Sequence, residues 1–169
     1  LAAVATGAAM GAEVVAVARG DDKLAAARAA GARHLIDARE EDRRAAVKAL
    51  GGADVVFDTV GGEVWQALFR AARPEARLLP VGFAGGDVPQ IPANHLLVKN
   101  LTVIGLNLGG YRRFAPERLA AALREVMDDA AAGRFDVRIG ARYAFPEAPA
   151  AIEALRARSV PGKIVVTAS

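Results

Sequence analysis

The sequence has no cysteine and no long apolar run, and each absence excludes a class of protein. Without cysteine, neither a disulfide nor a thiolate-bound metal can form within these 169 residues. No uninterrupted stretch reaches the roughly 18 apolar residues that a membrane-spanning helix needs. We therefore expect no membrane association, and a reducing, cytoplasmic setting is the expected location.

Aromatic residues and unbalanced charge are also scarce. Aromatics make up 5% of the chain, and the formal net charge is only +3. Charges of both signs are interspersed, as in the run from Arg39 to Arg44, which is typical of a solvated helix face. No basic tract contains interleaved aromatic rings, so nucleic-acid binding is not expected. His34 and His95 lie far apart in the sequence, and we predict no metal site.

The glycine turn Gly-x-Gly-x-x-Gly, the most specific motif of a dinucleotide-binding unit, is missing as well. Residues 1–10 have the character of a small-residue helix and lead into an apolar strand over 13–18. This order is typical of a dinucleotide-binding unit from which the first strand and the glycine turn are missing. We expect the intact protein, or a separate N-terminal half, to supply that strand. Without it, its neighbours would have unpaired edges, the strand at 163–167 would lack a sheet, and the isolated chain would be inactive.

What the sequence does contain is a regular alternation of strands and helices. Strands are predicted at 13–18, 33–37, 53–58, 77–82 and 101–106, with helices at 21–31, 40–50 and 63–72. Such alternation implies parallel strands joined by right-handed helical crossovers. The predicted fold class is α/β, with a doubly wound (Rossmann), mostly parallel sheet that is incomplete. Pro80 cannot donate to a ladder, so we expect a bulge or an early end of pairing in its strand.

The pattern changes after residue 107. A long helix is predicted over 116–132, followed by a strand over 138–145, a helix over 146–156 and a strand over 163–167. These elements need not belong to the first sheet. No low-complexity linker and no internal repeat marks the change.

Three loops of small residues follow successive strands, at 59–62, 82–86 and 105–110. In an open parallel sheet, ligands bind beyond the carboxyl ends of the strands. Small residues there let a flat ring or a phosphate approach the backbone, although short turns favour glycine for their own reasons. Three such loops in succession favour a binding role. Asp58, which ends one strand, is interpreted as a group that caps its loop rather than as a general base.

The end of the strand at 13–18 bears on the choice of cofactor. A unit that binds NAD usually has an acidic residue there, which accepts the ribose 2′-hydroxyl. This strand instead runs into Arg19, whose guanidinium can pair with a 2′-phosphate, and Lys23 can add a second cation. The pattern favours NADP(H); the alternative is that both residues are surface charges. Asp21 and Asp22 are interpreted as helix caps.

Five segments taken in order, Gly31–Asp37, Ala53–Gly62, Arg77–Gly85, Ile91–Asn94 and Gly162–Val166, carry a family resemblance. Together they resemble the medium-chain dehydrogenase/reductase superfamily, and most of all its zinc-independent NADPH:quinone oxidoreductase branch. The resemblance covers essentially the whole chain. It implies that residues 1–107 form the NAD(P)-binding domain without its first strand, and that residues 108–169 belong to the catalytic domain. The chain departs from the family at Ala38, often an aromatic residue or histidine, and at Pro80, usually valine.

The resemblance also implies roles for individual residues. The implied cofactor contacts are Arg19 and Lys23 at the 2′-phosphate, Val60, Gly61 and Gly62 along the ribose and nicotinamide, Gly82, Phe83 and Ala84 at the nicotinamide ribose, and Leu106 and Asn107 at the carboxamide. No catalytic side chain is implied, because hydride transfer in this branch depends mainly on positioning two rings.

The implied function is that of part of an NADPH-dependent oxidoreductase, which passes a hydride to a quinone or an activated enone or carbonyl substrate. A homodimer is implied through the strand at 101–106, which resembles an edge strand that pairs across a dimer. Two alternatives stay open. One is a zinc-dependent alcohol dehydrogenase of the same superfamily with its metal ligands outside this chain, and the other is a non-catalytic nucleotide-binding relative. A methyltransferase-like fold fits less well, given Arg19 and the closing residues 162–166.

Overall fold

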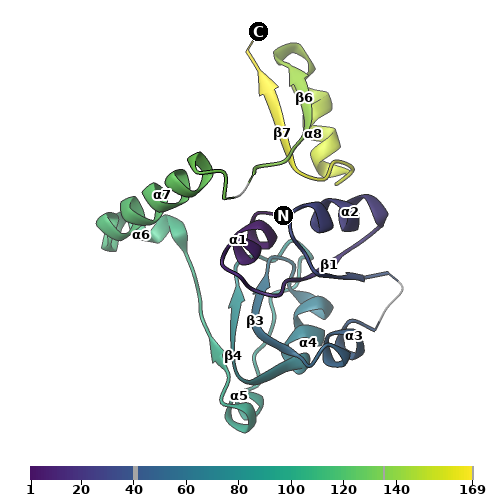
Figure 1. Ribbon diagram of the computed structural model, residues 1–169, viewed down its shortest axis with the longest axis vertical. Coiled ribbons are helices and arrows are strands. Elements are labelled where there is room, and N and C mark those ends of the chain that lie inside the picture. Colours follow the sequence, from purple (N-terminus) through teal and green to yellow (C-terminus); the bar gives the residue numbers. More distant parts are fainter. Residues whose placement is uncertain (40–41, 135, 169) are drawn as a thin grey trace. The chain divides into compact units, whose positions relative to one another are not determined.

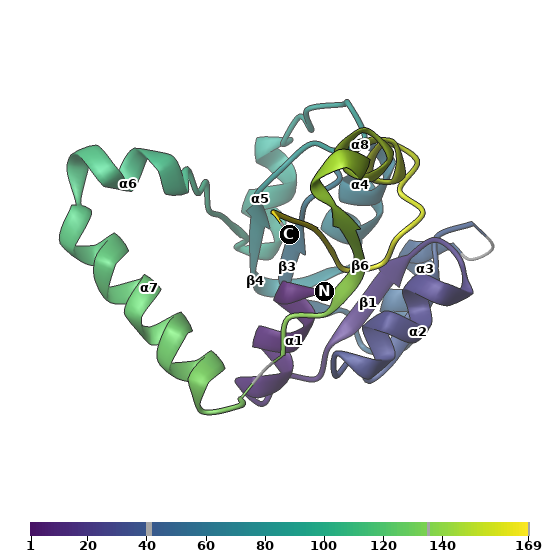
Figure 2. The same ribbon diagram turned by 90° about the horizontal axis from the view of Figure 1, so that it is seen from above.

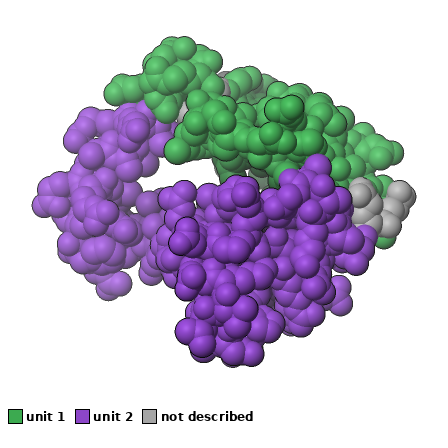
Figure 3. Space-filling view, turned by 60° about the horizontal axis from the view of Figure 1, so that its bottom comes forward, with its two compact units in different colours: residues 1–39, 127–169 green, residues 40–126 purple. Residues whose placement is uncertain are grey.

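The computed structural model describes residues 1–39, 42–134 and 136–168 (Figure 1). The chain forms two compact units (Figure 3). Unit 1 contains residues 1–39 and 127–169, and unit 2 contains residues 40–126. In the described part of the chain, no helix is both long and apolar enough to cross a membrane.

The first half of unit 1 is a parallel βαβ arrangement with a core of small residues. Its elements are α1 (Ala2–Ala9), β1 (Val15–Ala18), α2 (Asp21–Ala29) and β2 (His34–Asp37). β1 and β2 pair in parallel over their whole length, and α2 makes the crossover. Ala16, Ala27 and Ala32 form the buried cluster. Gly31 follows the end of α2 and has φ +105°. A Cβ on this residue would lie only 2.6 Å from the Cβ of Ala8.

The second half of unit 1 corrects one expectation about the C-terminal strand. It contains β6 (Ile139–Ala144), the short 3-10 turn η1 (Phe145–Glu147), α8 (Ala148–Arg156) and β7 (Lys163–Thr167). We expected the strand at 163–167 to lack a sheet. Instead β7 pairs in parallel with β6, and α8 provides the crossover between them.

Unit 2 is built on a three-stranded parallel sheet in the order β3-β4-β5. Its elements are α3 (Arg43–Ala49), β3 (Ala53–Asp58), α4 (Gly62–Ala71), β4 (Ala72–Pro80), α5 (Ala93–Lys99), β5 (Thr102–Val103) and α6 (Leu108–Phe114), and it includes most of α7 (Pro116–Ala131). Trp65, Phe69 and Leu78 lie at the centre of the core. The two rings stack with centroids 5.9 Å apart. Large side chains thus fill this core, because α4 lays one strongly apolar face on the sheet.

Pro80 explains why the fifth predicted strand is short. We expected a strand over 101–106, whereas β5 covers Thr102–Val103 only. The Ile104 N–H donates to the Leu78 carbonyl at 2.9 Å, so the next bond of this ladder would come from the N–H of residue 80. Proline has no such donor, and pairing with β5 ends. β4 itself ends at Pro80, which agrees with the expected early end of pairing. The irregularity in its register lies near its first residues, where it pairs with Ala53–Val55 of β3.

Two further boundaries differ from the sequence prediction. The helix predicted over 40–50 begins at Arg43, behind the N-cap Asp42, whose carboxylate accepts from the backbone of Arg44 and Ala45. Its predicted first residue, Glu40, lies outside the described residues. The segment from Leu108 was expected as a loop but forms α6, and α6 and α7 follow one another around a corner (Figure 2).

The pairings confirm the predicted α/β, mostly parallel class. Every strand pair in the described residues is parallel. The neighbour orders β2-β1 and β3-β4-β5 match strands 3-2 and 4-5-6 of the doubly wound order 3-2-1-4-5-6. Within the described part, β1 pairs only with β2, and β3 only with β4, so each has the unpaired edge that we expected.

Candidate functional site

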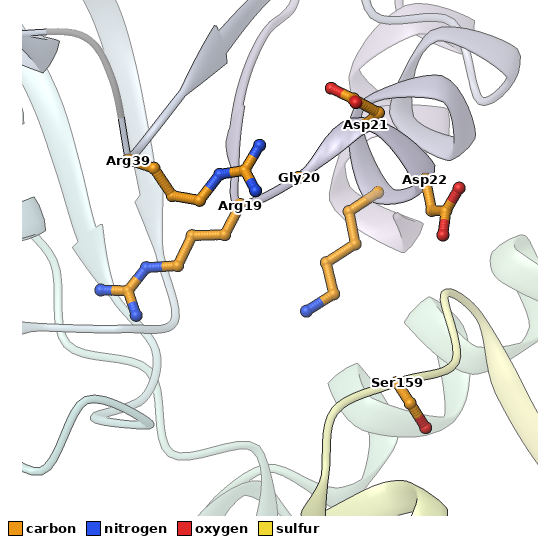
Figure 4. A pocket seen from close by; sticks show the side chains of 7 residues that line it. Arg19, Gly20, Asp21, Asp22, Arg39 and Ser159 are labelled. Carbon is orange, nitrogen blue, oxygen red and sulfur yellow. The ribbon is translucent and has the colours of Figure 1, made fainter.

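A small pocket of about 290 Å³ lies at the carboxyl end of β1, within unit 1 (Figure 4). Its lining includes Arg19, the first residue after β1, and Lys23, one turn into α2. Gly20 stands between them with φ +86°, a left-handed conformation that glycine adopts without strain. This turn starts α2 immediately and brings both cations to the same pocket, and their contact with a 2′-phosphate stays a prediction.

We expected the two acidic residues of this turn to cap the helix, and they do not. Gly20 is the N-cap of α2, and no side chain forms a capping hydrogen bond there. Asp21 and Asp22 occupy the first turn, where a carboxylate interacts favourably with the helix dipole. In Figure 4 their side chains lie on the helix side of the pocket, and those of Arg19 and Arg39 lie on the strand side.

Arg39 is a pocket residue that the sequence reasoning missed. It follows the end of β2 by two residues, and its side chain lines the same pocket. Because β1 and β2 are parallel with Ala18 opposite Asp37, residues that follow both strands meet at one edge. A cation soon after the second of two parallel strands was the signal that could have identified it.

Asp37, the last residue of β2, holds Arg39 in place. Its carboxylate is buried and accepts from the Arg39 Nε at 3.1 Å, from Nη2 at 2.6 Å and from the Arg39 backbone N–H at 2.9 Å. The side-chain hydrogen bond from Arg39 is the main cause that lowers the pKa of Asp37 to about 2. The carboxylate is therefore ionised at any pH near neutrality, and the guanidinium beside it is fixed.

A second group of predicted residues meets in unit 2, where the loops after β3 and β4 contact each other. The buried Asp58 accepts from the backbone N–H groups of Val60 and Gly61, each at 2.9 Å. This confirms its interpretation as a loop cap. The Ala84 N–H then donates to the Thr59 carbonyl at 3.0 Å. The two loops thus continue the strand pairing beyond the end of the sheet.

The glycines of these loops are needed for that contact between backbones. A Cβ on Gly61 would lie 2.5 Å from the Asp87 carbonyl oxygen, and one on Gly82 would lie 3.3 Å from that of Thr59. Gly61 also has φ +75°. Ligand approach and turn geometry are the two reasons for these glycines that the sequence suggests, and close packing of one loop on the other is a third.

The structure gathers most, but not all, of the predicted unit 2 residues. Val60, Gly61, Gly62, Gly82, Phe83 and Ala84 all belong to the two touching loops. Leu106 and Asn107 do not end a strand, because β5 stops at Val103. Asn107 is instead the N-cap of α6, and its side-chain oxygen accepts from the Gly110 N–H at 3.1 Å.

The histidines have other partners. His34 Nε2 lies 2.6 Å from a carboxylate oxygen of Glu13, which is the main cause that lowers the pKa of Glu13. The His95 ring stacks on Phe69 with centroids 5.9 Å apart. Among the described residues, no three histidine or acidic side chains are grouped so that they could hold a metal ion.

Residues 1–128 match the zinc-binding dehydrogenase family. Among curated proteins, the chain is 32% identical to a quinone oxidoreductase-like protein 2 homolog of Nematostella vectensis, over 68% of this chain and 32% of that protein. It is 33% identical to the quinone oxidoreductase-like protein 2 of Bos taurus, over 69% of this chain and 33% of that protein. The matched region thus spans about a third of these relatives.

A solved structure gives the same result for the fold. The quinone oxidoreductase of Thermus thermophilus, whose complex with NADPH is also known, superposes with a TM-score of 0.84 at 33% identity. The superposition covers 98% of this chain and 52% of that one. The chain therefore belongs to the zinc-binding dehydrogenase family and, with its quinone oxidoreductase-like relatives, to the medium-chain dehydrogenase/reductase superfamily.

Proposed function

We propose that the intact protein carrying this chain is an NADPH-dependent oxidoreductase whose substrate is a quinone or an activated enone or carbonyl compound. The observation that carries the proposal is the pocket at the end of β1, where Arg19 stands directly after the strand and Lys23 lines the same space. The Thermus relative, solved in complex with NADPH, supports this choice of cofactor.

The chemistry of the pocket fits a ribose 2′-phosphate. A guanidinium donates two parallel hydrogen bonds to a phosphate, and an ammonium adds a point charge. An acid directly after β1 would instead accept a free 2′-hydroxyl and would repel a phosphate. This chain has Arg19 in that place.

The touching loops of unit 2 are proposed as the binding surface for the other end of the cofactor. Val60 to Gly62 would lie along the ribose and nicotinamide, and Gly82 to Ala84 along the nicotinamide ribose. Their backbone is held by Asp58 and by the bond from Ala84 to Thr59, so it needs little ordering when a ligand binds. The proposed roles of Leu106 and Asn107 at the carboxamide are weaker, because the Asn107 side chain caps α6.

When bound, NADPH would supply a hydride from its nicotinamide ring. The task proposed for this chain is to hold that cofactor in a fixed orientation, since proximity and alignment of two rings account for much of the rate. The substrate gains a hydride and a proton.

A homodimer through the β5 edge remains part of the proposal, on a smaller basis than the sequence suggested. β5 is the outer strand of the β3-β4-β5 sheet, but only Thr102 and Val103 have strand geometry.

The description of the matched family favours one second candidate, a zinc-dependent alcohol dehydrogenase. Its metal ligands would have to lie outside this chain, which has no cysteine. Metal analysis of the purified intact protein separates the two candidates. Stoichiometric zinc whose removal abolishes turnover would favour the alcohol dehydrogenase, and full turnover of quinones without zinc would exclude it.

Titration of the intact protein with NADPH and NADH tests the proposed cofactor. We expect tighter binding of NADPH, and we expect Arg19→Ala to weaken NADPH about tenfold to a hundredfold while NADH changes little, since a hydrogen-bonded charge pair contributes about 1.5–3 kcal/mol. Arg124→Ala, which removes an exposed arginine of α7, is the matched control and should change neither. Equal losses for both cofactors would remove Arg19 from the role.

A further inference from the structure

We propose that Arg39, held by Asp37, is a further specificity-determining cation of this pocket, and that it binds the ribose 2′-phosphate together with Arg19 and Lys23. This inference rests on the proposed function, because it names a further contact for the same nucleotide. It also assigns Asp37 a task as the positioning residue for that contact.

The Arg39 guanidinium has a defined orientation. Asp37 occupies the edge formed by Nε and Nη2, through bonds of 3.1 Å and 2.6 Å. The opposite atom, Nη1, is directed toward Gly20, because a Cβ on that glycine would lie 3.7 Å from it. Gly20 begins α2 and lines the pocket. The carboxylate thus fixes one edge of the guanidinium. Figure 4 shows the Arg39 side chain beside Gly20 in the pocket lining.

Arg39 is expected to lose less conformational freedom on ligand binding than Arg19. Arg19 is exposed, so its long side chain loses rotamer freedom when it grips a ligand. Arg39 is held through both its backbone N–H and its side chain by a buried carboxylate. A cation that is already fixed loses less entropy per contact than a free one. Arg39 is therefore expected to contribute to selectivity alongside Arg19.

Asp37 itself carries a negative charge close to the proposed phosphate site. A carboxylate near a phosphate site would normally repel the ligand. Here it is buried at the end of β2, and the Arg39 guanidinium balances its charge. The opposite charges of Asp37 and Arg39 offset each other, and of the two residues Arg39 is the one that lines the pocket.

Two small probes test the proposal without any catalytic step. Titration calorimetry of the intact protein with 2′,5′-ADP and with 5′-ADP measures the discrimination due to the 2′-phosphate alone. We expect Arg39→Ala to weaken 2′,5′-ADP about tenfold and to leave 5′-ADP nearly unchanged. Arg33→Ala is the matched control, because Arg33 is an exposed arginine beside the same strand and does not line the pocket.

The positioning role of Asp37 has its own readout. It is the Kd for 5′-ADP divided by the Kd for 2′,5′-ADP, which measures the preference for the 2′-phosphate. Asp37→Asn should lower this ratio severalfold, since the amide cannot hold the guanidinium as an ion pair, and Asp37→Glu should restore part of it. If Asp37→Asn fails to fold, Arg39→Ala and Arg39→Lys still decide the matter, because Arg39 lies at the surface.

Each outcome has a separate meaning. Wild-type protein that binds both probes equally would contradict the proposed cofactor and this inference together. Selectivity that is lost in Arg19→Ala but intact in Arg39→Ala would overturn this inference alone. Equal weakening of both probes in Arg39→Ala, with a lower melting temperature, would show that the pair only stabilises the end of β2, and would also overturn it.

Discussion

The sheets β1-β2 and β3-β4-β5 have the same parallel plan but are packed in different ways. Alanines dominate the core of the first, with Ala16, Ala27 and Ala32 at its centre. The core of the second contains Trp65, Phe69 and Leu78. Large buried side chains contribute more to stability than alanine does. We therefore expect folding stability to reside mainly in the β3-β4-β5 sheet, while cofactor selectivity is proposed to reside at the edge of the β1-β2 sheet, whose core consists of small side chains.

The largest effect should come from a cavity in the β3-β4-β5 core. Leu78 is completely buried, so Leu78→Ala is expected to lower the free energy of unfolding by about 2–5 kcal/mol. Chemical denaturation of the intact protein measures this loss. Leu97→Ala is the control, because that side chain is 79% exposed and its removal should change little. Similar effects at both positions would show that this sheet does not dominate stability.

In the alanine core the damaging change is an added side chain. Ala27 is 3% exposed and packs α2 closely on β1, so Ala27→Leu should cost about 1–3 kcal/mol through overpacking. The exposed neighbour Ala25 tolerates the same change, which makes Ala25→Leu the matched control. A stabilising effect of Ala27→Leu would mean that the alanine core is loose rather than close-packed.

Lys99, at the end of α5, connects that helix to the junction of α4 and β4. Lys99 Nζ donates to the carbonyls of Arg70 at 3.1 Å and Ala72 at 2.7 Å, where α4 runs directly into β4. Desolvation is the main cause that lowers the pKa of Lys99. Lys99→Met keeps the length of the side chain and should cost about 1–2 kcal/mol, since it removes two charge-assisted bonds to backbone. Unchanged stability would show that water replaces the ammonium at this corner.

The smallest expected effect is a dependence of folding stability on acidic pH, and it arises at the carboxyl end of the β1-β2 sheet. The folded-state pKa of Asp37 is about 2, below its ordinary value of 3.8. A lowered pKa means that Asp37 stabilises the fold fully above pH 3.8 and loses this contribution as the pH falls toward 2. Denaturation curves between pH 5 and pH 2.5 should therefore show a shallower decline for Asp37→Asn than for the wild type. Parallel curves would contradict the strength of this ion pair.

Much of the fold was predictable because its signals are local. The apolar runs placed β1, β2 and β3 within two residues, and β4 ends early at Pro80, which was one of the two outcomes expected from that proline. β4 begins at Ala72, however, five residues before the start predicted for its strand. What failed depends on partners that the sequence does not display. β5 is short because Pro80 lies beside it in the ladder, and β7 has a sheet because β6 pairs with it. The domain boundary at residue 107 stays a prediction.

The site was predicted in part for the same reason. Arg19 and Lys23 are local features of one strand end, and the loops after β3 and β4 could be recognised by their glycines. Arg39 was missed because its place beside Gly20 follows from the parallel register of β1 and β2. Asn107 was interpreted as a ligand contact because α6 was not predicted. Without that helix, its N-cap could not be recognised either.

A crystal structure of the intact protein with NADPH tests the central claim most directly. We expect the 2′-phosphate of the cofactor within hydrogen-bond distance of the Arg19 guanidinium, with its nicotinamide beside the loops at Val60–Gly62 and Gly82–Ala84. A 2′-phosphate bound elsewhere, or a nicotinamide remote from both loops, would contradict the account.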